Sequence, residues 1–342
     1  MHKGMTPAYT DGELIRPLPI DHETSTAMSL AEATEPRRKA SRAKAGPNGK
    51  SPKASVRKAK LDIHPASHVL GVEIRGIDLR EKQSAETIAA LRDALTKHTL
   101  LLFRDQDITP EQHVAFSRRF GKLEHHVLAE YLLPGIPEIY VLSNIKKRGK
   151  TIGRAGVGEY WHSDLQYLAK PSLGSIMHAI EVPEVGGDTM FANQIAAYEA
   201  LSDGMKKLLD GLQVVNHFAK ARYLSSSGGY ARPFSDEELK KTTPVTHPAV
   251  RTHPETGEKA LYVSPAFALN FVGMTEAESR PILEFIYENS INPRFIHRHK
   301  WRAHDIVFWD NRSLMHYAVQ DYDRDNDRRH MQRTTITGDK PF

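Results

Sequence analysis

The chain has 342 residues, 39% hydrophobic and 26% charged, an ordinary composition for a soluble globular protein of one large domain or two smaller ones. It contains no cysteine, so disulfides, cysteine-ligated zinc, iron–sulfur clusters and a cysteine nucleophile are excluded, and a cytoplasmic location is expected. No apolar run reaches the roughly 18 residues that a membrane span needs, and no secretory signal is visible, so no membrane partner is expected.

The net charge of +5 is unevenly distributed along the chain. Residues 37–60 contain ten lysines or arginines and no acid, residues 1–36 sum to −4, and residues 61–342 therefore sum to −1. Because residues 1–60 also have few large apolar side chains, we predict a disordered basic N-terminal tail followed by one folded domain. A start codon placed too early (Met28 is a candidate start), a targeting or polyanion-binding role, and an inert extension remain alternative explanations of the tail. The nearly neutral domain predicts no nucleic-acid binding by the folded part and leaves a homo-oligomer open.

Short strands and a few helices follow one another after residue 60. Apolar spacing and capping residues predict helices at residues 84–98 with Ser84 as N-cap, 109–121 with Pro110 at the first position, 196–212 and 275–291. Short apolar or alternating runs predict strands within residues 68–79, 99–103, 139–144, 175–182, 186–193, 245–264 (a hairpin around 254–257), 294–301, 305–311 and 333–336. Strands and helices do not alternate regularly, which favours an antiparallel β barrel or jelly roll.

Residues 145–160, with the sequence IKKRGKTIGRAGVGEY, are predicted to form a long loop with four glycines and five bases. A loop of that length inside a domain is usually functional or disordered. Its glycines would permit the movement of a lid, and its bases would attract anions. We therefore expect it to close over an anionic substrate, the alternative being a solvated basic loop.

The stretch EYWHSDLQYLAKP, residues 159–171, places a histidine and an aspartate two positions apart at what looks like the start of a strand. In an extended chain, His162 and Asp164 would point to the same side. They are either two polar residues of a surface strand or two ligands of a metal site. A third ligand would have to come from elsewhere, and His316 follows the strand and turn of DIVFWDNRSLMH.

Four motifs in this order resemble the taurine dioxygenase family of Fe(II)- and 2-oxoglutarate-dependent dioxygenases. They are WHSD (161–164), GGDT (186–189), WDNRSLMH (309–316) and the arginine cluster 328–333. The resemblance implies a mainly β fold with flanking helices, the double-stranded β-helix or jelly roll. It also implies Fe(II) bound by His162, Asp164 and His316, 2-oxoglutarate and O₂ as cosubstrates, and release of succinate and CO₂. Two histidines and one carboxylate are the ligand set of non-haem iron oxygenases. Related halogenases lack the carboxylate, so Asp164 implies hydroxylation.

The same resemblance assigns the C5 carboxylate of 2-oxoglutarate to Arg329, with the hydroxyl of Thr189 as a second contact. A planar guanidinium can hold a carboxylate through two hydrogen bonds, which an ammonium cannot. The segment Asp323–Asp327 is slightly longer than the family pattern, so Arg328 remains an alternative to Arg329.

Substrate-binding residues implied by the resemblance are His126, Tyr167, Phe267 and Arg333, which lies four residues beyond Arg329. His125 is an alternative to His126, and Phe267 also fits an ordinary core position. The family's asparagine three residues before Trp161 is a glycine here, and Leu165 lies beside the aromatic Tyr167. We therefore expect a small organic anion of the sulfonate, alkyl sulfate or aryloxyalkanoate type, larger or less polar than taurine.

Two other classes of function remain open at this stage. The ligands His162, Asp164 and His316 would also suit a hydrolytic zinc enzyme with an open water site. That class gives no role to Arg329 or Thr189. The other class is a jelly-roll binding protein without redox chemistry.

Overall fold

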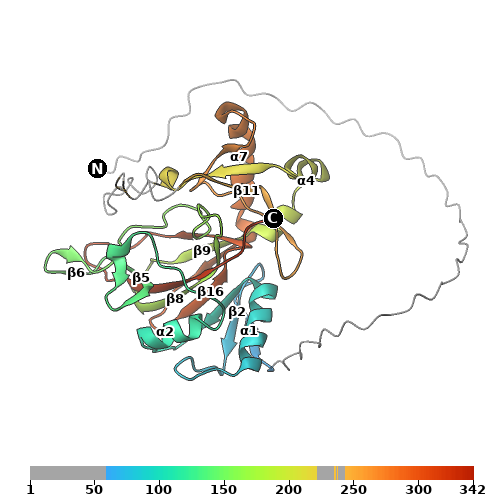
Figure 1. Cartoon of the computed structure of the whole chain (residues 1–342). Coiled ribbons are helices and arrows are strands. Elements are labelled where there is room, and N and C mark those ends of the chain that lie inside the picture. Colours follow the sequence, from blue (N-terminus) through green and yellow to red (C-terminus); the bar gives the residue numbers. More distant parts are fainter. Residues whose placement is uncertain (1–58, 222–234, 236, 238–242) are drawn as a thin grey trace, which may run out of the picture. The chain divides into compact units, whose positions relative to one another are not determined.

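The computed structural model describes residues 59–221, 235, 237 and 243–342 (Figure 1). The predicted basic tail therefore lies outside the described residues, except for its last two positions. None of the helices in these ranges is both long and apolar enough to cross a membrane.

The largest sheet, called the major sheet below, has eight strands in the order β1-β2-β3-β16-β8-β18-β5-β4. Strands β2 and β3 run parallel, and the other neighbours in this sheet run antiparallel. The strands are β1 (Asp62–Pro65), β2 (Val72–Arg75), β3 (Leu100–Phe103), β16 (Ile306–Asp310), β8 (Ser172–Glu181), β18 (His330–Thr337), β5 (Ile136–Ser143) and β4 (Leu132–Leu133).

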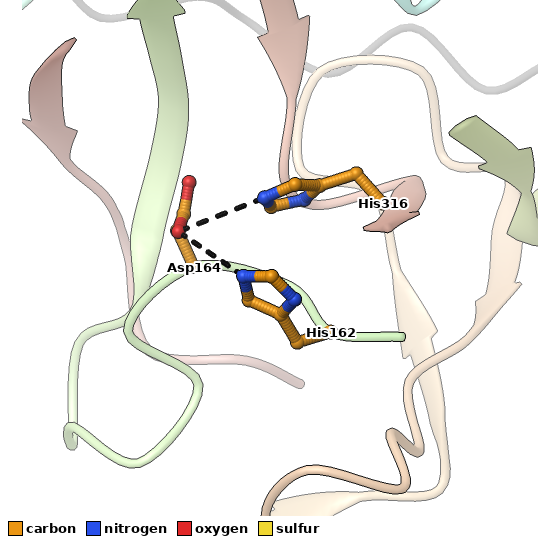
Figure 2. A group of neighbouring side chains, drawn as sticks. All are labelled: His162, Asp164 and His316. Carbon is orange, nitrogen blue, oxygen red and sulfur yellow. Dashed lines mark ion pairs between the residues drawn. The ribbon is translucent and has the colours of Figure 1, made fainter. Parts of the chain in front are cut away.

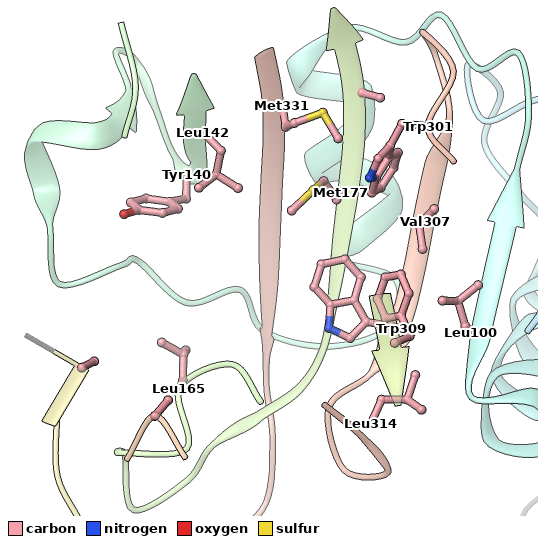
Figure 3. Close-up of a cluster of buried hydrophobic side chains, with 14 of the residues drawn as sticks. Leu100, Tyr140, Leu142, Leu165, Met177, Trp301, Val307, Trp309, Leu314 and Met331 are labelled. Atoms are coloured by element: carbon pink, nitrogen blue, oxygen red, sulfur yellow. The ribbon is translucent and has the colours of Figure 1, made fainter. Parts of the chain in front are cut away.

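A smaller sheet of three strands shares a hydrophobic core with the major sheet. Its order is β15 (Ile296–His299), β9 (Thr189–Asn193) and β17 (Leu314–Ala318). Leu314 from this sheet belongs to the same buried cluster as Met177 and Trp309 from the major sheet (Figure 3). Phe191 of β9 is part of that cluster too. Two sheets closed around one core form the predicted jelly roll, which is therefore confirmed.

Further small sheets complete the strands of the domain. They are β11 (Val245–Pro248), β10 (Gln213–Asn216) and β14 (Ala268–Phe271), then the hairpin β12 (Val250–Thr252) with β13 (Lys259–Leu261), and the pair β6 (Lys146–Lys147) with β7 (Lys150–Thr151). The predicted hairpin around residues 254–257 is confirmed as β12–β13. Strand β11, at the start of the predicted hairpin segment, pairs instead with β10.

Three of the predicted helices are confirmed. They are α1 (Ala85–His98), α2 (Pro110–Ser117) and α7 (Glu276–Ser290). Each begins after a side-chain N-cap, as when the Ser84 hydroxyl accepts a hydrogen bond from the Thr87 N–H at 3.1 Å. Helix α2 ends about one turn earlier than predicted. Short 3₁₀ turns lie at Ala129–Tyr131 and Pro293–Phe295.

The prediction of one helix over residues 196–212 is wrong. The segment forms two helices, α3 (Gln194–Glu199) and α4 (Asp203–Leu209). Ser202 between them has an extended backbone, and its hydroxyl accepts a hydrogen bond from Met205 N, which makes it an N-cap. A serine that caps a new helix ends the previous one, because its own backbone cannot be helical.

The prediction of an irregular loop over residues 145–160 is also wrong in part. Residues 146–151 form the exposed β6–β7 hairpin, which projects from the domain in Figure 1. Arg154 then forms a parallel bridge to Leu142 of β5. Four of the five bases therefore lie on an exposed hairpin, and Arg154 alone among them is buried.

Candidate active site

A cavity lies where the major and smaller sheets face each other. It encloses about 970 Å³, including the part open to solvent. All nine site residues predicted from the sequence line it: His126, His162, Asp164, Tyr167, Thr189, Phe267, His316, Arg329 and Arg333.

The two histidines and the aspartate of the predicted metal site converge in this cavity (Figure 2). Asp164 Oδ1 lies 3.8 Å from His162 Nε2 and 3.9 Å from His316 Nε2. The imidazole rings lie with their centroids 4.1 Å apart. All three side chains are buried. Three donor atoms facing one point, two nitrogens and one carboxylate oxygen, are suited to a divalent transition metal.

Backbone pairing brings the two histidines together, although they are 154 positions apart in the sequence. His316 N donates to His162 O at 2.8 Å, and His162 N donates to His316 O at 3.1 Å. The expectation that His162 and Asp164 begin a strand is wrong. His162 forms this single bridge, and Asp164 enters a turn in which Leu165 has a φ of 58°. The turn directs both side chains to the same point.

Hydrogen bonds fix the orientation of the Asp164 carboxylate. Ser175 donates to its Oδ2 at 2.7 Å, and Arg333 Nη1 donates to its Oδ1 at 2.6 Å. Asn311 accepts from the Asp164 N–H and donates to the Ser175 hydroxyl. Partners of this kind orient metal ligands and tune their affinity. The sequence analysis did not identify Ser175 or Asn311, although Asn311 lies inside the WDNRSLMH motif.

The protonation states of the three groups suit metal binding. His162 Nδ1 lies 2.8 Å from Tyr160 O, and because a carbonyl can only accept, Nδ1 carries the proton and Nε2 keeps its lone pair. Burial lowers the pKa of His162 and lowers that of His316 well below its usual value. Burial alone would raise the pKa of Asp164, but the Arg333 guanidinium and the hydrogen bond from Ser175 lower it overall. Two neutral imidazoles and one carboxylate result.

A buried arginine lies at another part of the cavity. Arg329 is 8% exposed, and its Nε donates to Gly187 O at 3.2 Å. Burial lowers its pKa, because the cation loses hydration. The Asn144 side chain accepts a hydrogen bond from Arg329 N. Arg328, the alternative, is exposed and forms an ion pair with Glu181.

Thr189 lines the same cavity. Its hydroxyl oxygen accepts a hydrogen bond from Trp301 Nε1 at 3.0 Å, so its own hydrogen remains available to a further acceptor. The preceding GGDT turn depends on Gly186, which has a φ of 82° and whose missing Cβ atom would collide with Asp321 O. The motif therefore places Thr189 at the start of β9.

Aromatic side chains form part of the remaining walls. The His126 ring stacks on Tyr140 at 4.1 Å, and Tyr167 contacts Phe267 with ring centroids 5.2 Å apart. Phe267 lines the cavity and also belongs to the hydrophobic core. The two predicted positions of Phe267, in the pocket and in the core, are therefore compatible. Arg333 pairs directly across the strands with Tyr140.

Tyr140 and Arg154 also line the cavity and were not singled out as site residues by the sequence analysis. Tyr140 and Leu142 lie two positions apart on β5 and both line the cavity, so the alternation at the start of IYVLSN could have indicated inward side chains. Nothing in the sequence marks Arg154 apart from the other four bases around it.

Comparison with known proteins agrees with this geometry. The family model described as taurine catabolism dioxygenase TauD, TfdA family matches residues 62–335. An alpha-ketoglutarate-dependent 2,4-dichlorophenoxyacetate dioxygenase of Cupriavidus pinatubonensis is 31% identical over 81% of this chain and 96% of its own length. An alpha-ketoglutarate-dependent sulfate ester dioxygenase of Pseudomonas putida is 30% identical over 82% of this chain and 91% of its own length.

Solved structures show the same fold. A taurine dioxygenase from Burkholderia xenovorans superposes with a TM-score of 0.68 at 35% identity, covering 82% of this chain and 90% of that one. AAD-2, solved in complex with Mn(II) and N-oxalylglycine, superposes with a TM-score of 0.69 at 32% identity, covering 83% and 99%. The chain thus belongs to the TauD, TfdA family and is a 2-oxoglutarate-dependent dioxygenase.

Proposed function

We propose that this enzyme hydroxylates a small organic anion, using Fe(II) held by His162, Asp164 and His316. The observation that carries the proposal is the convergence of this ligand set in one cavity with a buried arginine and a threonine hydroxyl. Bound iron and 2-oxoglutarate supply the oxidation of a C–H bond by O₂, with succinate and CO₂ as by-products. The chain itself supplies binding, orientation and exclusion of water.

The metal ligands are held ready before a metal binds. The hydrogen bond from His162 Nδ1 to Tyr160 O keeps Nε2 free as a ligand atom. Ser175 donates to one carboxylate oxygen of Asp164, and the other oxygen, Oδ1, accepts from Arg333 and faces both histidines. The ligands therefore need little rearrangement.

Arg329 and Thr189 bind the C5 carboxylate of 2-oxoglutarate. A buried guanidinium loses hydration and gains most from an anion that replaces it. The Thr189 hydroxyl, which accepts from Trp301, donates its hydrogen to the same carboxylate. This pair explains why a buried cation lies in the cavity, which a zinc hydrolase would not require. Neither that alternative nor a binding protein without redox chemistry gains support from the family membership.

The substrate lies beside His126, Tyr167, Phe267 and Arg333. Their aromatic rings provide apolar walls, and the arginines in the cavity favour a negative charge. The relatives named for 2,4-dichlorophenoxyacetate and for sulfate esters support a carboxylate or sulfate monoester with an apolar body. The taurine dioxygenase structure supports the sulfonate class.

Two measurements test this function. Succinate release from 2-oxoglutarate, with Fe(II) and ascorbate, is measured across sulfonates, alkyl sulfates, aryloxyacetates and neutral phenols, and an anion should give the strongest stimulation. Anaerobic addition of Fe(II) and 2-oxoglutarate should give a visible metal-to-ligand charge-transfer band. A folded, metal-loaded protein without that band, or one stimulated best by a neutral compound, would contradict the proposal.

A further inference from the structure

Arg154 lies on a segment whose backbone is tied to β5. Arg154 N donates to Val141 O at 2.9 Å, and Ser143 N donates to Arg154 O at 3.1 Å. The preceding Gly153 lies so close to β5 that a Cβ atom there would stand 2.7 Å from Val141 O. Only glycine permits this approach. The two hydrogen bonds hold the backbone of Arg154 in place, as they would in a strand.

The Arg154 side chain is 6% exposed and lines the cavity. Its Nη1 donates to the Tyr140 hydroxyl at 3.4 Å. Burial alone would lower the pKa of Arg154, but its interactions with Tyr140, including the hydrogen bond to the hydroxyl, help to raise it overall, so the guanidinium stays charged. A hydroxyl that accepts from an arginine keeps its own hydrogen for an anion. Arg154 and Tyr140 together therefore present donors to the cavity.

Among the described residues that line the cavity, positive charges outnumber negative ones. The described lining residues include three arginines and one carboxylate. Arg333 donates to that carboxylate, Asp164, and Arg329 is assigned to 2-oxoglutarate. Fe(II) and the 2-oxoglutarate dianion would cancel each other's charge. An anionic substrate would offset part of the excess that remains.

We propose that Arg154 is a specificity-determining residue that binds the oxyanion of the substrate together with the Tyr140 hydroxyl. This proposal rests on the proposed function, because it takes the substrate to be an organic anion. Carboxylates, sulfonates and sulfate monoesters share the arrangement of oxygens that a guanidinium fork can hold. Arg333, with Nη1 on Asp164, contributes less than Arg154 to the discrimination between anionic and neutral substrates.

The test compares an anion with its neutral counterpart. With Fe(II) and 2-oxoglutarate bound under anaerobic conditions, calorimetric titration measures the Kd of 2,4-dichlorophenoxyacetate and of 2-(2,4-dichlorophenoxy)ethanol. Arg154→Gln should raise the Kd of the acid about 10- to 100-fold, since hydrogen bonds to charged groups are lost. The Kd of the alcohol should change by less than about threefold, and Arg154→Lys should give an intermediate loss for the acid. Hexyl sulfate and hexanol repeat the comparison with a sulfate.

Arg148→Gln is the matched control, because Arg148 carries the same charge on the exposed β6–β7 hairpin. It should leave all these constants unchanged. The inference is overturned if Arg154→Gln binds the acid as wild type does, or if it weakens acid, alcohol and 2-oxoglutarate alike, as a purely structural role would. Failure of the proposed function would be detected separately, if no anion of the panel stimulated succinate release by the wild-type enzyme. The inference about Arg154 would then fail as well.

Discussion

The two faces of the major sheet are built from the same strands but bury different chemistry. Residues Tyr140, Met177, Val307 and Trp309 belong to one buried cluster, and all of them except Val307 also line the cavity. Their neighbours Ile139, Val141, Ile176, Ile306 and Phe308 point to the other side and pack with α1 and α2 in a second cluster. The period of two in each strand separates the faces.

On the cavity face, charged groups are buried and paired, as in Asp164 with Arg333. On the helix face, the buried titratable groups include His113 and His178, which are held neutral. The comparison teaches that one face of a sheet can stabilise the fold by packing against helices, while the other face presents charged groups to a binding cavity. Changes on the cavity face should therefore alter binding and turnover, and also stability where a buried charge loses its partner, whereas changes on the helix face should alter stability alone.

Asp164→Ala should have the largest effect, and it tests whether the cavity face also contributes to stability. Turnover should be abolished with the loss of a metal ligand. Because Asp164 and Arg333 are 4% and 7% exposed, the variant also leaves a buried guanidinium without its carboxylate. The unfolding free energy of the metal-free protein should fall by about 3–5 kcal/mol. Urea denaturation measures this loss.

Asp164→Ala combined with Arg333→Met serves as the control for that experiment. It removes both charges and should recover most of the lost stability, without recovering activity. A single Asp164→Ala variant as stable as wild type would show that this ion pair does not stabilise the fold.

Arg329→Ala should have the second largest effect, on the binding of 2-oxoglutarate. Loss of one partner of a buried charge pair costs about 2–5 kcal/mol, so the KM for 2-oxoglutarate should rise roughly 30- to several-thousand-fold. Arg328→Ala is the matched control, because its ion pair with Glu181 is exposed and contributes little. The KM values of the two variants are compared by measuring succinate release as a function of 2-oxoglutarate concentration. A larger effect at Arg328 would mean that Arg328, and not Arg329, binds the C5 carboxylate.

Acid sensitivity tests the helix face. Burial, aided by His178, lowers the pKa of His113 to about 3, and burial lowers that of His178 to about 4. An unfolded histidine titrates near 6.5, so the unfolded chain binds more protons as the pH falls below that value. Stability should be complete above about pH 6.5 and should fall toward pH 4, by roughly 3 kcal/mol for a fully buried histidine.

Burial also lowers the pKa values of His162 and His316, so these histidines contribute to the loss of stability at low pH as well. The variant His113→Gln separates the contribution of His113 from theirs. Urea unfolding of the metal-free protein at pH 7, 5.5 and 4 should show a smaller loss of stability in the variant than in wild type. Equal losses in the two proteins would mean that His113 does not contribute to acid sensitivity.

The sequence predicted the residues whose spacing is local. The motif WHSD contains two of the proposed metal ligands, and WDNRSLMH contains the third. The jelly roll followed from strand patterns and from the family resemblance, and it is confirmed. The nine predicted site residues share one cavity, while their individual roles stay predictions.

The sequence could not reveal contacts that depend on register between distant strands. Tyr140 lies opposite Arg333 only because β5 and β18 pair in that register. The hydrogen bond from Arg333 to Asp164 joins residues 169 positions apart. Arg154 lies among exposed bases in the sequence, and its burial follows from a single bridge to β5. Register of this kind is set by the packing of the whole sheet.

Ser175→Ala should have the smallest effect, and it sharpens the comparison between the faces. The change removes the hydrogen bond to Asp164 Oδ2 without touching a metal ligand. Loss of such a partner lowers metal affinity by about 10- to 100-fold. Ser117→Ala is its match on the helix face, where the Ser117 hydroxyl is equally buried and bonds to His113 O and Thr334. Both variants should lose about 1 kcal/mol of stability. In a Mn(II) titration followed by electron paramagnetic resonance, only Ser175→Ala should bind the metal more weakly. Equal affinities would mean that Arg333 alone is enough to orient the carboxylate.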